Sequence, residues 1–256
     1  MITIKTEKEI EILKEAGHVL ASILYAVLKE VKPGVSALNL DKYAEELIYK
    51  AGGRPSFKGF KTKDNKISFP SSLCVSLNDE VVHGIPYENK ILKSGDIVSL
   101  DLGMEYKGLF VDMARTIIAG QTDEICKNLL EVCRRALEAA IFEAHDGNFV
   151  GDISESIQKY VKSHGFNVVR KLVGHGVGYG VHEEPEIPNF GRRGGSPKLK
   201  KGMILAIEPM ITERGFDVFL DCNGWTWKTK DGSRAAHFED TVLVGGEKGE
   251  ALTDFV

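Results

Sequence analysis

Two copies of one short sequence motif in this chain each end in a carboxylate. Leu92–Asp101 and Leu199–Glu208 both follow the pattern Leu-Lys-x-Gly-x-Ile-x-x-Leu/Ile-acid. Each copy places an acid at the end of an apolar, strand-like run, where a charge is rarely kept without a partner. We therefore expect both halves of the chain to contribute carboxylates to one shared site. The usual occupant of such a site is a divalent metal ion or a pair of them.

Asp101 and a further acid, Asp112, flank a glycine-bounded segment that is typical of a β-hairpin with its tip near Tyr106–Lys107. If the register is centred there, the two carboxylates face each other across the strands. Directly opposed like charges are unfavourable, so this arrangement predicts a cation between them. The alternative is that one aspartate faces solvent while the other caps a turn.

The second half of the chain adds histidines and glutamates. Residues 173–185 are rich in glycine, which lets the backbone approach a ligand closely, and they carry His175 and His182. Glu208 and Glu239 each stand beside a strand-like run. Two aspartates, two glutamates and one histidine make an oxygen-rich set of ligands. Such a set suits Mn, Fe(II) or Co(II) better than a structural zinc.

Four other histidines are expected to be structural: His18, His145, His164 and His237. In particular, we expect His237 to point away from the face of its strand that Glu239 uses.

Two similar series of elements must position these residues. In the first half, a capping box at Thr6–Glu9 opens a helix that stops at Lys32–Gly34, a second helix spans 37–50, and strands span 73–77, 96–103 and 109–118. In the second half, helices are expected over 122–145 and 152–164, and strands over 168–173, 203–210, 216–221 and 236–244. This order predicts an α+β fold, an antiparallel sheet flanked by helices. We expect one domain over 1–256, with pseudo-symmetric halves at about 6–118 and 122–250.

Composition excludes several classes of protein. A 43% hydrophobic content and a net charge of −4 fit an ordinary globular protein and argue against binding nucleic acid or a membrane surface. No apolar run approaches the roughly 18 residues of a spanning helix, and the N-terminus lacks the apolar core of a signal peptide. The four cysteines form no CxxC pair. A cytoplasmic location is therefore expected.

In its candidate site residues and in their sequence context, the chain resembles the methionine aminopeptidases. Five residues match the metal ligands of that family in order and context: Asp101, Asp112, His175, Glu208 and Glu239. The flanking sequence motifs also match those of the family over 76–86, over the HGxGxxxHEEP segment at 175–185, and at 207–210 and 224–226. The length is similar to the short bacterial type I form. The resemblance implies the pita-bread fold, an α+β domain with internal pseudo-two-fold duplication.

The same resemblance implies hydrolytic removal of the initiator methionine from peptides and nascent chains. It implies two divalent ions, drawn from Co, Mn, Fe(II) or Zn, with Asp112 and Glu239 as shared ligands. Glu208 would be both a ligand and the acceptor of the proton from the attacking water. His182 would stabilise the oxyanion, and His83 would hydrogen-bond the scissile amide.

The family pattern also implies a methionine pocket. Its expected lining is Cys74, Trp225, Phe60 and Phe69. The stretch 61–71 is longer and more polar than the common form, and Val181 replaces a residue that is often aromatic, which favours a wider pocket. Asp240 follows Glu239 where the family usually has histidine, and its extra charge could alter metal affinity.

We expect a monomer that acts on the N-terminus of a peptide or nascent chain, and leave a weak ribosome association open. Two alternatives remain. An X-Pro peptidase of the same fold would share the acids and the HGxGxxxHExP phrase, although those enzymes usually carry a large additional N-terminal domain. A non-catalytic binding protein on this fold, such as a ribosome- or RNA-associated relative, would have lost metal ligands, and all five are present here.

Overall fold

The computed structural model describes residues 2–62 and 67–254. The helices within them are α1 (Glu7–Leu28), α2 (Ala37–Lys50), α3 (Glu124–Glu143) and α4 (Val150–Ser163). The strands are β1 (Arg54–Pro55), β2 (Leu73–Leu77), β3 (Glu80–Val82), β4 (Asp96–Tyr106), β5 (Leu109–Ala119), β6 (Asn167–Val168), β7 (Val173–Gly176), β8 (Glu183–Pro188), β9 (Ile204–Ile207), β10 (Met210–Thr212), β11 (Val218–Leu220), β12 (Trp227–Thr229), β13 (Ala235–His237), β14 (Glu239–Leu243) and β15 (Glu250–Ala251).

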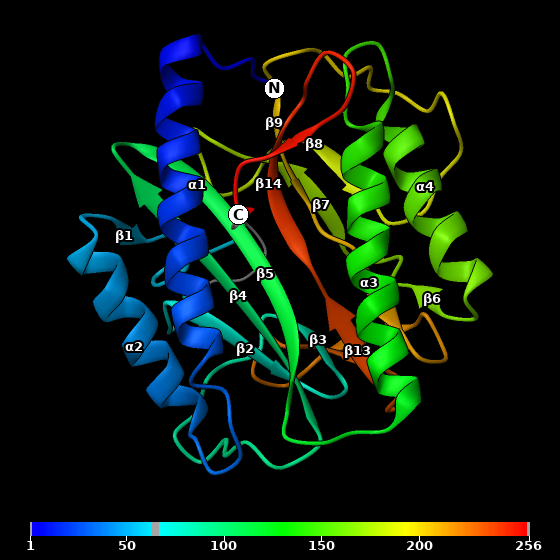
Figure 1. Ribbon diagram of the computed structural model, residues 1–256. Coiled ribbons are helices and arrows are strands. Elements are labelled where there is room, and N and C mark those ends of the chain that lie inside the picture. Colours follow the sequence, from blue (N-terminus) through cyan, green and yellow to red (C-terminus); the bar gives the residue numbers. More distant parts are fainter. Residues whose placement is uncertain (1, 63–66, 255–256) are drawn as a thin grey trace.

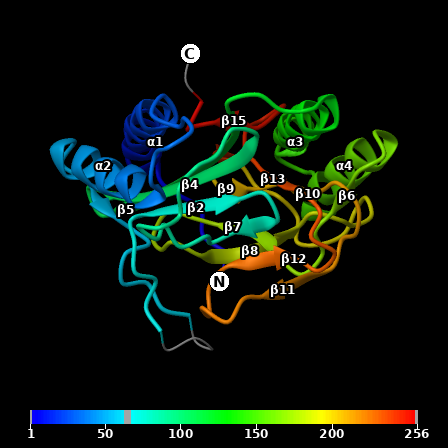
Figure 2. The ribbon, with the colours of Figure 1, turned by 90° about the horizontal axis from the view of Figure 1, so that it is seen from below.

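Most of these strands form one sheet with the order β1-β4-β5-β14-β9-β7-β8, to which β2 adds beside β4 and β15 beside β14, and its pairs are antiparallel. Figure 1 shows α1 beside β4 and β5, α2 beside β1 and β2, and α3 beside β14. All four helices lie on one face of the sheet, and β11 and β12 lie beyond its other face (Figure 2). The α+β class predicted from the sequence is confirmed.

Each helix pair covers its own hydrophobic core. One cluster of buried residues lies between α1, α2 and strands β4 and β5, and a second lies between α3, α4 and strands β9 and β14. Burying these apolar faces is the main force that fixes the helices on the sheet. Both predicted halves contribute strands to the same sheet, while their division at 6–118 and 122–250 stays a prediction. No helix among the described residues has the length and apolar character needed to cross a membrane.

The β4–β5 hairpin has a different register from the predicted one. Tyr106 pairs with Leu109, so the turn is Lys107–Gly108, one residue beyond the centre expected from the sequence. Both turn residues have positive φ, 51° and 83°, as a two-residue type I′ hairpin turn requires. Asp101 therefore pairs with Ala114 rather than with Asp112. The predicted direct opposition is wrong, and the two aspartates are instead diagonal neighbours on one face of the sheet.

Two of the predicted strands are interrupted beside the candidate site. The run expected over 203–210 is divided between β9 and β10, because Pro209 has no N–H for a ladder bond. The run expected over 236–244 is divided between β13 and β14 at Phe238. Ile207 pairs with Asp240 and Met210 pairs with His237, so the register is the same on both sides of the break. The break therefore brings Glu208 and Glu239 opposite each other.

Two further predicted elements differ from the structure. The strand expected over 168–173 is wrong, because only its two ends belong to strands, β6 and β7. The first helix ends at Leu28, before the predicted stop.

Candidate active site

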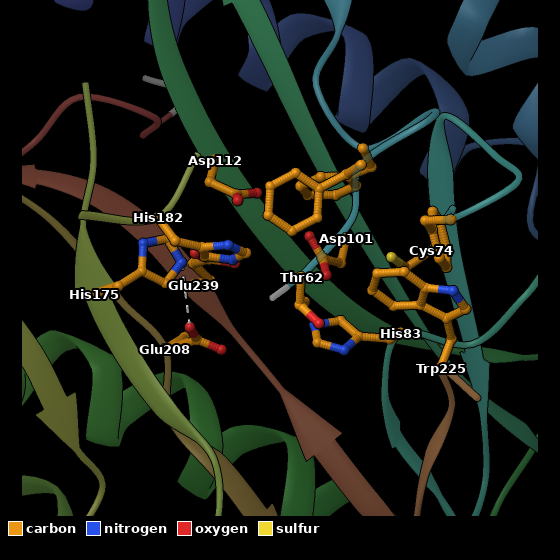
Figure 3. Close-up of a pocket in the computed structure, with 13 residues that line it drawn as sticks. Thr62, Cys74, His83, Asp101, Asp112, His175, His182, Glu208, Trp225 and Glu239 are labelled. Carbon is orange, nitrogen blue, oxygen red and sulfur yellow. Dashed lines mark ion pairs between the residues drawn. The ribbon is translucent and has the colours of Figure 1, made fainter. Parts of the chain in front are cut away.

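One cavity on the strand face opposite the helices contains every site residue predicted from the sequence. The residues that line it are Phe57, Phe60, Thr62, Phe69, Cys74, His83, Asp101, Asp112, His175, His182, Glu208, Trp225 and Glu239. Figure 3 shows Asp112, Glu208 and Glu239 with His175 and His182 at one end, Cys74 with Trp225 at the other, and Asp101 on the side of the acids that faces Trp225. The cavity is therefore polar at one end and largely apolar at the other.

The polar end collects side chains from strands of both halves. Ligand atoms of Asp112, His175 and Glu239 all lie within 4.8 Å of one another. Glu208 joins them, because its Oε1 lies 3.7 Å from Nε2 of His175. The Nδ1 atom of His175 lies 2.9 Å from the carbonyl oxygen of Gly176, which leaves Nε2 to face the cavity.

The four carboxylates at this end are buried close together. Burial raises the pKa of Asp112, Glu208 and Glu239 well above the ordinary range, and each is raised further by neighbouring carboxylates. Burial and the charge of Glu208 raise the pKa of Asp101 to about 7. Among the described residues, only histidines lie within ion-pair distance of Glu208 and Glu239, and no ion pair reaches Asp101 or Asp112.

These acids have the chemistry of a divalent cation site. Oδ1 of Asp101 and Oε1 of Glu239 are buried and have no hydrogen-bond partner among the described residues. Buried carboxylates without a partner are costly, and a cation bound between them removes that cost. Carboxylate oxygens with one imidazole nitrogen suit Mn, Fe(II) or Co(II). The residues present therefore fit the metal ions that the sequence predicts, while each residue's role as a ligand stays a prediction.

The raised pKa of Asp101 predicts how pH affects the metal-free protein. A carboxyl whose pKa is near 4 in the unfolded chain and about 7 in the fold contributes stability below pH 4, and this contribution is lost as the pH rises through 7. We therefore expect Asp101→Asn to stabilise the chelator-treated protein more at pH 7.5 than at pH 5, by roughly 2–4 kcal/mol. Urea denaturation at both pH values measures this difference. Equal effects at the two pH values would contradict it.

His182 lies at the metal end of the cavity, with its ring centroid 4.4 Å from that of His175, and His83 lies nearer Trp225, with ring centroids 6.3 Å apart. Desolvation lowers the pKa of each to about 4, so both rings are neutral at pH 7 and carry one N–H that can be donated. The ring of His182 is open to solvent on one side and packs edge-on against Phe60 and His175. His83 has a φ of 56°, a backbone conformation that non-glycine residues rarely adopt. The structure thus places two neutral donors beside the acids.

His237 also faces this site, and its expected orientation away from Glu239 is wrong. Residues two positions apart along a strand share a face, so the spacing of the two residues was itself a signal for this placement. His237 is 1% exposed, and its Nε2 lies 3.3 Å from Oε2 of Glu208 and 3.8 Å from Oε2 of Glu239.

Asp240 lies on the opposite face of β14 from Glu239. Its Oδ1 accepts hydrogen bonds from Arg115 at 2.7 Å and from Thr253 at 2.7 Å. Arg115 also donates to the carbonyl oxygen of Glu239 at 2.6 Å. The charge of Asp240 is therefore compensated by Arg115, and the pair ties β5 to β14 behind the site.

The apolar end is built from aromatic and small side chains. Phe69, Cys74 and Trp225 are buried there, with Phe57, Ile85 and Val181 in the same cluster and Phe60 packed against it. Phe69 and Trp225 meet edge to face at 5.3 Å, and Nε1 of Trp225 donates to the carbonyl oxygen of Ile67. Phe57 and Thr62 were not predicted from the sequence, although they lie in an aromatic-rich segment, which was the available signal. Part of the predicted long polar stretch 61–71, residues 63–66, lies outside the described residues.

A wider cavity adjoins this one through His83, His175, His182 and Glu208. Its outer lining is mostly polar: Thr3, Lys171, Tyr179, Gly180, Glu183, Glu184 and Glu186, with Val82, Leu172, Val173 and Met210. The metal end of the first cavity therefore connects to an open, polar cleft.

Comparison with known proteins gives one consistent result. Residues 11–245 match the family described as Metallopeptidase family M24. The chain is 44% identical to the methionine aminopeptidase of Clostridium acetobutylicum and 43% identical to methionine aminopeptidase 1 of Bacillus subtilis, in each case over 99% of both chains. The crystal structure of the methionine aminopeptidase of Thermotoga maritima superimposes with a TM-score of 0.95 at 46% identity, over 100% of both chains. A prolidase from Pyrococcus horikoshii is similar in fold alone, with a TM-score of 0.78 at 23% identity over 64% of its own length.

Proposed function

Since this chain belongs to the methionine aminopeptidases of metallopeptidase family M24, metal-dependent hydrolases that remove an N-terminal methionine, we propose a role for each end of its cavity. The acidic end holds the divalent metal ions, and the aromatic end holds the methionine side chain. The antiparallel sheet flanked by helices is the pita-bread fold of this family. The observation that carries the proposal is the buried group of carboxylates with unpartnered oxygens beside His175.

The positions of the acids support a division into shared and unshared ligands. Asp112 and Glu239 lie on the adjacent strands β5 and β14, in the middle of the group, and would hold two ions between them. Asp101 would complete the set on one side, and His175 with Glu208 on the other. When bound, Co, Mn, Fe(II) or Zn ions lower the pKa of water and polarise the scissile carbonyl.

The other polar groups of the site would handle protons and developing charge. Glu208 lines the cavity, with its Oε1 3.7 Å from Nε2 of His175 and beside the proposed metal ions, which suits it to accept the proton of the attacking water. The neutral rings of His182 and His83 each have an N–H to donate, His182 to the tetrahedral oxyanion and His83 to the scissile amide.

The shape of the cavity explains the choice of an N-terminal residue. The aromatic end is closed by Phe69, Cys74 and Trp225, so one apolar side chain fits there. The remainder of the peptide would leave through the adjoining polar cleft. A free α-amine placed beside the metal ions would account for aminopeptidase rather than endopeptidase action.

Trp225→Ala is expected to weaken methionine selection. Removing one wall of the pocket takes away apolar contact with the methionine side chain. A difference of one methylene in such a pocket changes kcat/KM by about 10–200-fold. We therefore expect KM for a Met-Gly peptide to rise about 10-fold or more, with release of bulkier N-terminal residues increasing relative to methionine. Trp227→Ala is the matched control, since Trp227 packs in a separate cluster with Val81 and Met210. An unchanged KM and unchanged preference in the Trp225 variant would contradict the pocket assignment.

We further propose that the protein acts as a single-domain cytoplasmic monomer on peptides and nascent chains, with at most a weak ribosome contact. The expected metal ligands and pocket residues all line one cavity of this chain, which supports a site formed within a single subunit. The four free cysteines suit a reducing compartment.

The decisive experiment compares two peptides, Met-Gly-x-x and x-Pro-x-x, with metal-stripped protein before and after addition of Co(II), Mn(II) or Fe(II). The proposal predicts metal-dependent release of methionine from the first peptide alone, and the rates rank the ions. Preferential cleavage of the second peptide would favour the X-Pro peptidases. Bound metal without cleavage of either peptide would favour a binding protein on this fold.

A further inference from the structure

His237 is a buried polar residue to which the proposed mechanism gives no task. Its side chain is 1% exposed, and neither ring nitrogen makes a hydrogen bond with any described residue. Buried polar atoms in folded proteins are almost always hydrogen-bonded, and an exception calls for an explanation. No hydrogen bond to a described residue therefore explains why a histidine is buried here.

The backbone of His237 is held from the opposite strand. Its N–H donates to Oγ1 of Thr116 at 3.0 Å, and its carbonyl oxygen accepts from the same hydroxyl at 2.6 Å. The Thr116 hydroxyl also lies 2.8 Å from that of Ser99 on β4. Pairing of His237 with Met210 fixes the other side of β13. Because both sides of this strand are anchored, the ring is directed toward the acids.

The ring meets Glu208 on the side away from His175. Nε2 of His237 lies 3.3 Å from Oε2 of Glu208, whereas Nε2 of His175 lies 3.7 Å from Oε1. The carboxylate of Glu208 therefore lies between two imidazoles, one near each oxygen. A glutamate side chain has three rotatable bonds, so a fixed donor at one oxygen determines where the other points.

We propose that His237 is a positioning residue that donates its N–H to Oε2 of Glu208 and thereby holds Oε1 toward His175 and the metal. This inference rests on the proposed function, since it concerns the same site. His237 does not touch the substrate in this arrangement, and it acts through Glu208. The effect belongs to the hydrogen bond rather than to the imidazole, so another side chain with an N–H of similar reach can supply it.

The test compares His237→Leu, which keeps similar volume without a donor, with His237→Gln, which keeps an N–H. Binding of Mn(II) is measured by calorimetry on metal-stripped protein, and kcat and KM are measured separately on a Met-Gly peptide. We expect the Leu variant to bind Mn(II) about 10–100-fold more weakly and to lose kcat, with KM little changed. The Gln variant should recover most of both losses. Thermal unfolding of the metal-free variants shows whether each one is folded.

Each outcome decides the inference. A folded Leu variant with wild-type metal affinity and kcat would overturn it. Equal losses in the Leu and Gln variants would also overturn it, because that result assigns the imidazole itself as a ligand. If the Leu variant does not fold, His237→Asn replaces it, since its shorter amide should fail to reach Glu208 and should lose affinity where Gln does not. Wild-type protein that binds no metal and releases no methionine would instead refute the proposed function.

Discussion

Asp112→Ala or Glu239→Ala is expected to abolish methionine release while leaving the fold intact. Both carboxylates lie in the middle of the acidic group, where each is proposed to serve two ions. Loss of a single oxyanion donor already costs enzymes about 10²–10³ in kcat, and loss of a shared ligand should cost more. Turnover of a Met-Gly peptide and the metal content of each purified variant measure the effect.

The fold should survive because these carboxylates do not stabilise the metal-free protein. Burial and mutual repulsion raise the pKa of both, so removing one relieves repulsion. Asp240→Asn is the matched control: it lies next to Glu239 but faces Arg115, so we expect lower stability with activity retained. Near-normal turnover in either alanine variant would contradict the two-metal arrangement.

His182→Ala is expected to lower kcat by about 10²–10³ with little change in metal content. Its neutral ring lies at the metal end of the cavity, beside His175, and would donate to the oxyanion only as charge develops there. An interaction that forms only in the transition state lowers kcat rather than raising KM. Steady-state kinetics on a Met-Gly peptide separates the two parameters.

His164→Ala provides a comparison for this variant, since His164 stacks on Tyr160 at the end of α4 and does not line the cavity. It should retain wild-type kinetics. If His182→Ala raised KM alone, His182 would be a substrate-binding group without a role in stabilising the oxyanion.

Elements that depend on local signals could be predicted well. The helix over 37–50 and the strand over 73–77 have the predicted bounds, because a capping serine and a run of β-branched and apolar residues act within a few positions. The turn of the β4–β5 hairpin was placed one residue early, because a two-residue turn with positive φ at both positions was not recognised at Lys107–Gly108.

The order and flanking motifs of the four acids and His175 are local patterns, so the sequence was enough to propose which residues could do chemistry here. It could not determine how those residues meet. Glu208 and Glu239 come opposite each other because the β9–β14 and β10–β13 pairs keep one register on both sides of the interruption at Pro209. That pairing also turns His237 into the site and leaves Asp240 behind it, against Arg115. Register between distant strands is set by the packing of the whole sheet, so the set of side chains that share the cavity could not be derived from local patterns and became clear from the folded structure.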